Sequence, residues 1–90
     1  MFEWDDEKNL ANIEKHGIDF DTAKRIFEGQ TLTIIDDRFD YGEVREISIG
    51  MVDGIAILTV AHTDREDKIR IISARRANQK ERARYEQEIL

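Results

Sequence analysis

KIRIISARRANQKERARY, residues Lys68 to Tyr85, is the stretch that decides the fold, because it predicts a strand, a basic turn and a helix in immediate succession. Its first half contains three isoleucines, and β-branched residues pack well on a pleated, buried surface. Asn78, followed three residues later by Glu81, is a helix-start signal. From Arg70 to Arg84 there are six basic residues against one acid, in a chain whose net charge is -6. The stretch therefore predicts both a scaffold and a site.

The composition indicates one small folded domain and excludes several kinds of site. Ninety residues, of which 40% are hydrophobic and 38% charged, support a single domain spanning residues 1–90. The chain has no cysteine, which excludes disulfides, thiolate metal ligands and cysteine nucleophiles, and its two histidines are too few for most histidine-based metal sites. The acids between Asp36 and Glu43 lack the spacing of an EF-hand and indicate a solvated loop. We therefore expect no metal and no other cofactor.

The hydropathy pattern predicts a protein of the cytoplasm. No apolar run approaches the roughly 20 residues that a membrane span requires, and no basic segment followed by an apolar one begins the sequence. We expect neither a membrane anchor nor a targeting leader.

Upstream of the deciding stretch, the apolar pattern changes from helical spacing to β spacing. Gly17 and Gly29 each end a helical pattern, and β-branched runs follow them. Asp53-Gly54 is a strong hairpin signal between two of these runs. This order predicts an α+β fold, in which two N-terminal helices precede a four-stranded, mostly antiparallel meander sheet and a C-terminal helix. The expected elements are a helix from Asp5 or Asp6 to about Lys15 or His16, a helix from Asp21 to Gly29, strands at Thr31–Asp36, Val44–Val52, Ile55–His62 and Lys68–Ala74, a charged turn at Thr63–Asp67 before the last strand, and a helix at Gln79–Leu90.

Acidic and basic residues are unevenly distributed along the chain. Residues 1–45 contain twelve acids and six bases, whereas residues 46–90 contain eight of each. A net charge of -6 repels nucleic acid, which argues against a large duplex-binding surface. A small basic cleft is compatible with this distribution. So is a solvated helix face, which is the ordinary explanation of a basic cluster.

Arginine and histidine near the ends of the last two strands suggest RNA cleavage without a metal. RNA supplies its own nucleophile, the 2'-hydroxyl, so a protein needs only a base, an acid and cations that stabilise the pentavalent phosphorane. Arg65, Arg75 and Arg76 are candidates for the cationic role, because a guanidinium bonds two phosphate oxygens at once. His62 is the candidate acid or base; the alternative is a strand-end histidine bonded to backbone.

Four further residues are candidates for contacts with RNA. Lys15 and His16 lie at the predicted end of the first helix, where the helix dipole alone explains basic residues. Lys80 belongs to the basic cluster at the start of the last helix. Tyr85 shares a helix face with Ile89, a position that favours packing over base stacking.

Several segments together resemble the BrnT toxin family. They are FEWDDEKNLANIEKHGIDF at the start, DDRFDYGEVREISIG in the middle and IRIISARRANQKERARYE at the end. The specific feature is the order of the short motifs EWD, KHG, D-R-x-x-YGE-x-R, T-D-R and RIISAR, with YE near the end. The resemblance covers nearly the whole chain.

The resemblance implies a RelE-like fold and a ribonuclease toxin of a type II toxin-antitoxin system, which inhibits translation by cutting RNA. It also implies a BrnA-type antitoxin that neutralises the toxin in a hetero-oligomer and that alone contacts the operator DNA. Arg65, Arg75 and Arg76 match the family's motif and would carry function. Lys15, His16 and Tyr85 match it too. The alternative is a catalytically weak binding module that pairs with the antitoxin in operon autoregulation. Whether the RNA is cut free or on the ribosome stays open.

Overall fold

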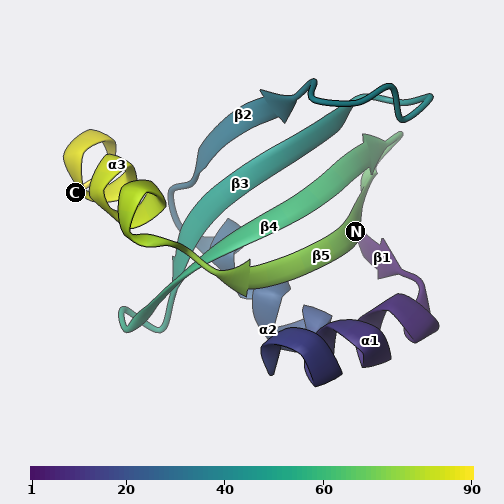
Figure 1. Cartoon of the computed structure of the whole chain (residues 1–90), viewed down its shortest axis with the longest axis horizontal. Coiled ribbons are helices and arrows are strands. Elements are labelled where there is room, and N and C mark those ends of the chain that lie inside the picture. Colours follow the sequence, from purple (N-terminus) through teal and green to yellow (C-terminus); the bar gives the residue numbers. More distant parts are fainter.

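The computed structural model describes residues 1–90 as one five-stranded sheet with helices packed against it (Figure 1). In space the strands lie in the order β1-β5-β4-β3-β2. The predicted α+β class is confirmed. In chain order the elements are β1 (Phe2–Trp4), α1 (Asp6–His16), α2 (Phe20–Ala23), the 3-10 helix η1 (Lys24–Glu28), β2 (Leu32–Asp36), β3 (Arg45–Val52), β4 (Ala56–Arg65), β5 (Lys68–Arg76) and α3 (Gln79–Glu88).

The strand β1 is the main departure from the expected order. Residues Phe2 to Trp4 pair in parallel with β5, Phe2 opposite Ile69 and Trp4 opposite Ile71. The sheet is therefore five-stranded and mixed, and the prediction of four mostly antiparallel strands was wrong in this detail. Three residues are too few to display the alternation that reveals a strand, and the pairing depends on a partner more than sixty residues away.

Two tight hairpins join β3, β4 and β5 in antiparallel register. At the first, Asp53 and Gly54 both have positive φ, 56° and 68°, which a tight hairpin turn needs and an Asp-Gly pair adopts readily. The predicted hairpin is confirmed. At the second, the ladder extends to the pair Arg65 and Lys68, so only two residues form the turn. The predicted turn starting at Thr63 was therefore too long.

The first helix matches its prediction, whereas the second does not. The Asp5 side chain caps α1 by accepting from two backbone N–H groups, and Gly17 ends it with φ 71°. The second predicted helix is only four residues of α-helix, followed by five of 3-10 helix. Its fully buried residues are Phe20, Ala23 and Ile26. They recur every three residues, which is the period of a 3-10 helix.

All helices of the chain are too short or too polar to span a membrane.

Alternation along β3 divides the buried residues between the two faces of the sheet. Ile49 packs with Ala77 and Tyr85 under α3. Gly50 faces the other way, against Ile26 of η1. A Cβ atom at Gly50 would lie 2.7 Å from the Ile26 Cβ, so η1 can approach β3 this closely only because the residue is glycine.

The free edge of β5 is covered by a side chain rather than by a strand. Asn12 of α1 donates to the Ala74 carbonyl at 2.8 Å and accepts from the Ala74 N–H at 3.1 Å. Its amide also donates to the Ile18 carbonyl at 2.8 Å. Asn12 thus pairs with Ala74 as a neighbouring strand would, at the point where β1 no longer reaches.

Candidate functional site

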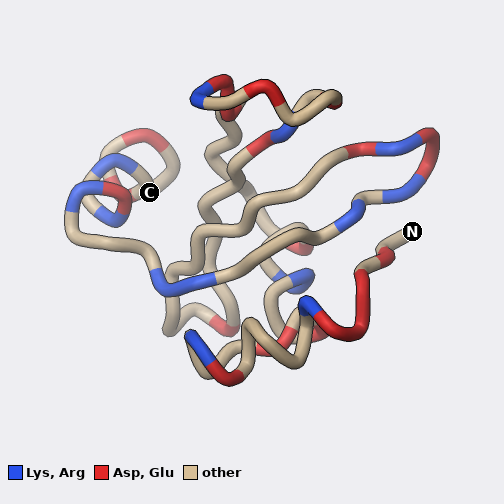
Figure 2. Tube along the Cα trace, turned by 45° about the vertical axis from the view of Figure 1, so that its right-hand side comes forward, with Lys and Arg blue, Asp and Glu red and all other residues tan.

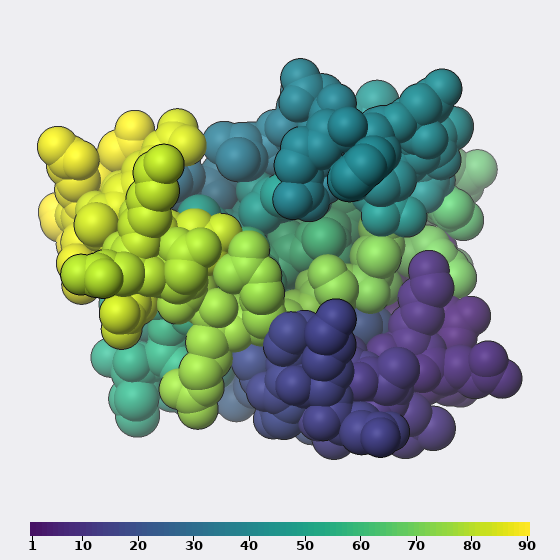
Figure 3. All heavy atoms as spheres, viewed as in Figure 1, coloured from purple at the N-terminus to yellow at the C-terminus, as the bar shows by residue number.

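Helix α3 covers only one end of its face of the sheet (Figure 1). In Figure 3 atoms of β4 and β5, drawn in green, are visible between α3, the loop after β2 and the N-terminal segment. We call this uncovered region the open face. Side chains on one face come from cross-strand pairs. The pairs on this face from β4 and β5 are Thr59 with Arg75, Ala61 with Ser73 and Thr63 with Arg70.

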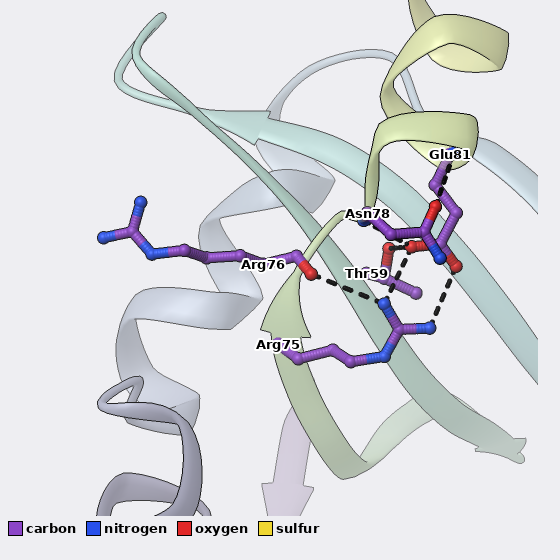
Figure 4. Close-up of polar contacts among 5 residues, drawn as sticks. All are labelled: Thr59, Arg75, Arg76, Asn78 and Glu81. Carbon is purple, nitrogen blue, oxygen red and sulfur yellow. Dashed lines mark hydrogen bonds and ion pairs between the residues drawn. The ribbon is translucent and has the colours of Figure 1, made fainter.

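Arg75 is held at the border of the open face by the start of α3 (Figure 4). Its guanidinium forms a two-pronged ion pair with Glu81, at 2.7 and 2.9 Å. Glu81 also accepts from the Thr59 hydroxyl at 3.0 Å and from the Asn78 backbone N–H at 2.9 Å. Asn78 and Glu81 form a capping box, so the helix start positions Glu81, and Glu81 positions Arg75. The Arg75 side chain stays 42% exposed, within reach of a bound anion.

These contacts also set the protonation of the pair. Hydrogen bonds to Glu81 raise the pKa of Arg75, against the opposing effects of burial and of the positive charge of Arg38. Burial alone would raise the pKa of Glu81, but hydrogen bonds from Arg75, the Asn78 backbone and Thr59 lower it overall. Glu81 is therefore ionised at neutral pH and a poor proton acceptor.

The loop between β2 and β3 is anchored by one buried acid. Asp36, the last residue of β2, accepts hydrogen bonds from Arg38 at 2.8 and 3.0 Å and from the Tyr41 hydroxyl at 3.0 Å. The bonds from Arg38 hold the pKa of Asp36 well below its usual range in spite of burial. Asp36 pairs with Arg45 across the strands, on the same face as α3. The interpretation of this segment as a solvated acidic loop was therefore wrong for Asp36.

Arg45 is the arginine of the open face that has no acidic partner. Its guanidinium carbon lies 3.9 Å from the centroid of the Tyr41 ring. Its Nε is buried and has no hydrogen-bond partner. By contrast, Arg70 contacts Glu3 at 3.5 Å. A guanidinium already stacked on an aromatic ring loses little freedom when it binds an anion, so Arg45 is well prepared to bind phosphate.

The three arginines predicted as catalytic do not converge. Arg65 and Arg75 both lie on the α3 side of the sheet, and Arg65 pairs with Glu43 at 2.9 Å. Arg76 points away from Arg75 (Figure 4) and lines a cavity on the other side of the sheet together with Gly17. The side chains of Arg75 and Arg76 therefore do not form one phosphate site in this structure.

Lys15 and His16 also lie away from the open face. They are the last residues of α1, directly before Gly17, and so belong to the neighbourhood of Arg76. The dipole of α1 accounts for both without any contact to RNA. Figure 2 shows blue positions at the end of β5, in α3 and around the turn between β4 and β5, whereas the entry to α1 is red.

The two candidates on α3 differ in their exposure. Lys80 is exposed and lines a cavity between α3 and the sheet, together with Ile34 and Arg84. Tyr85 is 3% exposed, and its hydroxyl donates to the Gln30 carbonyl at 3.1 Å. Tyr85 therefore packs in the core and is not available to stack on a base, as the packing interpretation of the sequence held.

His62 is buried on the opposite side of the sheet from Arg75. It is 3% exposed, and its ring packs edge-on against Phe27 at 5.1 Å between centroids. Its Nε2 lies 2.8 Å from the Ser48 hydroxyl and its Nδ1 lies 3.1 Å from Asp64. The arrangement of Ser48, His62 and Asp64 resembles a Ser-His-Asp triad. Ser48 has no exposed surface, however, and cannot contact a substrate. The alternative interpretation of His62, a strand-end histidine bonded to backbone, also differs from the structure, because both ring nitrogens lie next to side chains.

One group of side chains has the composition and spacing of a metal site. One ligand atom each from Glu46, His62 and Asp64 lies within 4.8 Å of the other two. These residues are on the side of the sheet away from the open face.

The most important residues that the sequence analysis did not single out are Arg38, Tyr41 and Arg45. All three fall within the motif D-R-x-x-YGE-x-R, which was a usable signal. Asp36, directly before the motif, was assigned to the solvated loop. Glu43, within the motif, forms an ion pair with Arg65.

Known proteins match this chain in sequence pattern and in fold. The family model described as "Ribonuclease toxin, BrnT, of type II toxin-antitoxin system" matches residues 4–81. A solved structure, the ribonuclease toxin BrnT of Brucella abortus, is similar with a TM-score of 0.65 and 28% sequence identity over 88% of this chain and 99% of that chain. No curated protein matches the chain significantly.

Proposed function

The chain belongs to the BrnT family of ribonuclease toxins of type II toxin-antitoxin systems, and from this premise we propose that its open face binds RNA and cuts it without a metal ion. In the proposed reaction the 2'-hydroxyl loses its proton and attacks the adjacent phosphorus. The bond to the 5'-oxygen breaks, that oxygen takes up a proton, and one product ends in a 2',3'-cyclic phosphate. Cutting of messenger RNA would inhibit translation.

The observation that carries this proposal is Arg45, which has no carboxylate partner. Two further arginines, Arg75 and the Asp36-bound Arg38, lie on the same side of the sheet. The chain as a whole is acidic, so cations gathered on one face are an unusual feature of it. Cations held in place before substrate binds can stabilise the charge of the phosphorane without reorganising.

The proposed site has no evident general base. His62 is buried on the other side of the sheet, the lowered pKa of Glu81 makes it a poor proton acceptor, and arginine remains protonated. The face would therefore act by orienting the ribose and phosphate and by stabilising negative charge. Such a nuclease is slow on free RNA, or it needs the ribosome to complete its site.

The experiment is an RNA cleavage assay in EDTA with the purified chain and three variants. Arg45→Ala and Arg75→Ala each remove one cation of the open face, and we expect each to reduce cleavage at least about 10-fold. Arg76→Ala is the matched control, because Arg76 is the next residue of the same strand and points to the other side. The ends formed are analysed for cyclic phosphate.

Three results have clear meanings. Cleavage with cyclic ends that is lost in Arg45→Ala and retained in Arg76→Ala supports the proposal. Equal loss in all three folded variants contradicts the assignment of the open face. If the folded chain does not cut free RNA, the assay is repeated with translating ribosomes, and failure there rejects the ribonuclease function of this chain.

A type II toxin has a protein antitoxin as partner. We propose an antitoxin of the BrnA type that forms a hetero-oligomer with this chain and supplies the contact with operator DNA. The net charge of -6 supports this division of roles, because neutralisation of phosphate is the main source of affinity for duplex DNA.

A second candidate function is a binding module that pairs with the antitoxin but has weak or no catalytic activity. Two observations favour this binding module: the open face has no accessible base, and the ion pair with Glu81 partly neutralises Arg75. The cleavage assays above decide between the two functions.

A further inference from the structure

A group of three donor side chains lies on the side of the sheet that the proposed RNA site does not use. His62 and Asp64 are two residues apart on β4 and so point to the same face, and Glu46 of β3 is the cross-strand partner of His62. One ligand atom of each lies within 4.8 Å of the other two. The ladder between β3 and β4 fixes the backbones that present all three.

The imidazole of His62 is held as a metal-binding histidine usually is. The Ser48 hydroxyl lies 2.8 Å from Nε2, and Thr33 lies 2.7 Å beyond Ser48. If Nε2–H donates to Ser48 and Ser48 donates to Thr33, Nδ1 presents its lone pair toward Asp64. In metal sites, a hydrogen bond from the ring nitrogen that does not bind the metal fixes the tautomer and the ring orientation of the histidine.

The charge at this place is not balanced by the protein. Glu46 is half-buried and forms no hydrogen bond or ion pair through its side chain, and the carboxylate of Asp64 has His62 as its only polar partner. The nearest basic residue along β4, Arg65, is paired with Glu43. Two carboxylates therefore lie close to one imidazole, and neither is paired with a lysine or an arginine. Their uncompensated negative charge favours the binding of a cation.

We propose that Glu46, His62 and Asp64 bind one first-row divalent transition metal ion, with Zn²⁺ as the reference ion, and that the ion fastens β3 to β4. A donor set of one imidazole nitrogen and two carboxylate oxygens suits Zn²⁺ or Co²⁺, with a fourth position left for water. Mg²⁺ and Ca²⁺ prefer oxygen ligands alone and should bind much more weakly. The buried His62 and the half-exposed Asp64 leave a path from solvent on the Asp64 side.

This inference goes beyond the proposed function and does not depend on it. The ion would lie on the opposite side of the sheet from Arg75, so it takes no part in the proposed cleavage, which is assayed in EDTA. A failed metal-binding test therefore leaves the ribonuclease proposal standing, and the reverse also holds.

The test is a titration of the EDTA-treated, desalted chain with Zn²⁺ by calorimetry, together with Co²⁺ absorption spectra and thermal melts. We expect one Zn²⁺ per chain, the visible bands of four-coordinate Co²⁺, and a rise in Tm of about 5 °C or more at saturating Zn²⁺. Mg²⁺ should give none of these signals. Absence of saturable Zn²⁺ binding by the folded chain rejects the proposal.

The chain offers matched controls for each kind of ligand. Glu46→Gln and Asp64→Asn should each weaken Zn²⁺ binding at least about 10-fold, whereas Asp67→Asn, in the adjacent turn, should leave it unchanged. The chain has only two histidines, so His62→Gln is compared with His16→Gln. Binding that survives Glu46→Gln and Asp64→Asn, or that is lost in His16→Gln, overturns the assignment even if His62→Gln fails to fold.

Discussion

Gly50 sets how closely η1 can approach the sheet. In Gly50→Ala the new Cβ would lie 2.7 Å from the Ile26 Cβ and 3.1 Å from the Thr31 Cγ2, so the 3-10 helix must move away. We expect the variant to lower the free energy of unfolding by about 1–3 kcal/mol, as overpacking of a core does. Urea denaturation measures this loss. Gly29→Ala, where nothing lies within 4 Å, is the control, and an equal loss there would contradict the steric explanation.

Asp36 should make stability depend on pH in the acid range. Its pKa in the folded protein is below the value of about 3.9 in an unfolded chain, so its ionised form is favoured by folding. The resulting stabilisation is complete above pH 3.9 and is lost as the pH falls toward the folded pKa. Asp36→Asn lacks this contribution. The difference in unfolding free energy between wild type and Asp36→Asn should therefore be larger at pH 7 than at pH 2.5. Urea titrations at the two pH values measure the unfolding free energies. The same difference between wild type and Asp36→Asn at both pH values would contradict the stabilising role of ionised Asp36.

At the scale of single elements, the edge of β5 depends on one amide. In Asn12→Ala the N–H and C=O of Ala74 and the Ile18 carbonyl lose their partner in a buried place. One unsatisfied buried group costs about 1–3 kcal/mol, so we expect a destabilisation of at least about 2 kcal/mol. Hydrogen exchange of the Ala74 amide should also accelerate. Glu14→Ala, on the exposed side of α1, controls for the change in the helix and should alter neither measurement by much.

Elements with local signals were predictable from the sequence, and those that depend on distant partners were not. Asp53-Gly54 encodes its hairpin, and the Asn78 to Glu81 spacing encodes the capping box of α3, because both signals act within four residues. The strand β1 carries no such signal. Its three residues become a strand only because β5 lies beside them.

The candidate site was only partly predictable, because its geometry follows from where strands end. The sequence prediction ended β5 at Ala74 and β4 at His62, whereas the strands continue to Arg76 and Arg65. Alternation within the longer β5 sends Arg75 and Arg76 to opposite faces. Within the longer β4, His62 is an interior, buried residue and not an exposed strand end.

At the scale of the whole molecule, the two sides of the sheet have different chemical character. The α3 side presents Arg38, Arg45 and Arg75, with one guanidinium free of acid. The α2 side presents the unbalanced carboxylates of Glu46 and Asp64 around His62. For the proposed RNA binding, this division offers a chain of net charge -6 one side where arginines gather, and the local field at a binding site matters more than the total charge.

This division predicts how RNA binding depends on salt. Each phosphate contact to single-stranded RNA contributes about 0.7 to the slope of log affinity against log salt concentration. Arg45→Ala removes one such contact and should lower the slope by about 0.7, whereas Arg76→Ala on the other side should leave it unchanged. Fluorescence anisotropy with a 2'-O-methyl RNA, which cannot be cut, measures binding alone. Equal slopes for wild type and Arg45→Ala, with both variants folded, would place the RNA elsewhere on the surface, because a basic face that contacts phosphate cannot lose its free arginine without losing salt dependence.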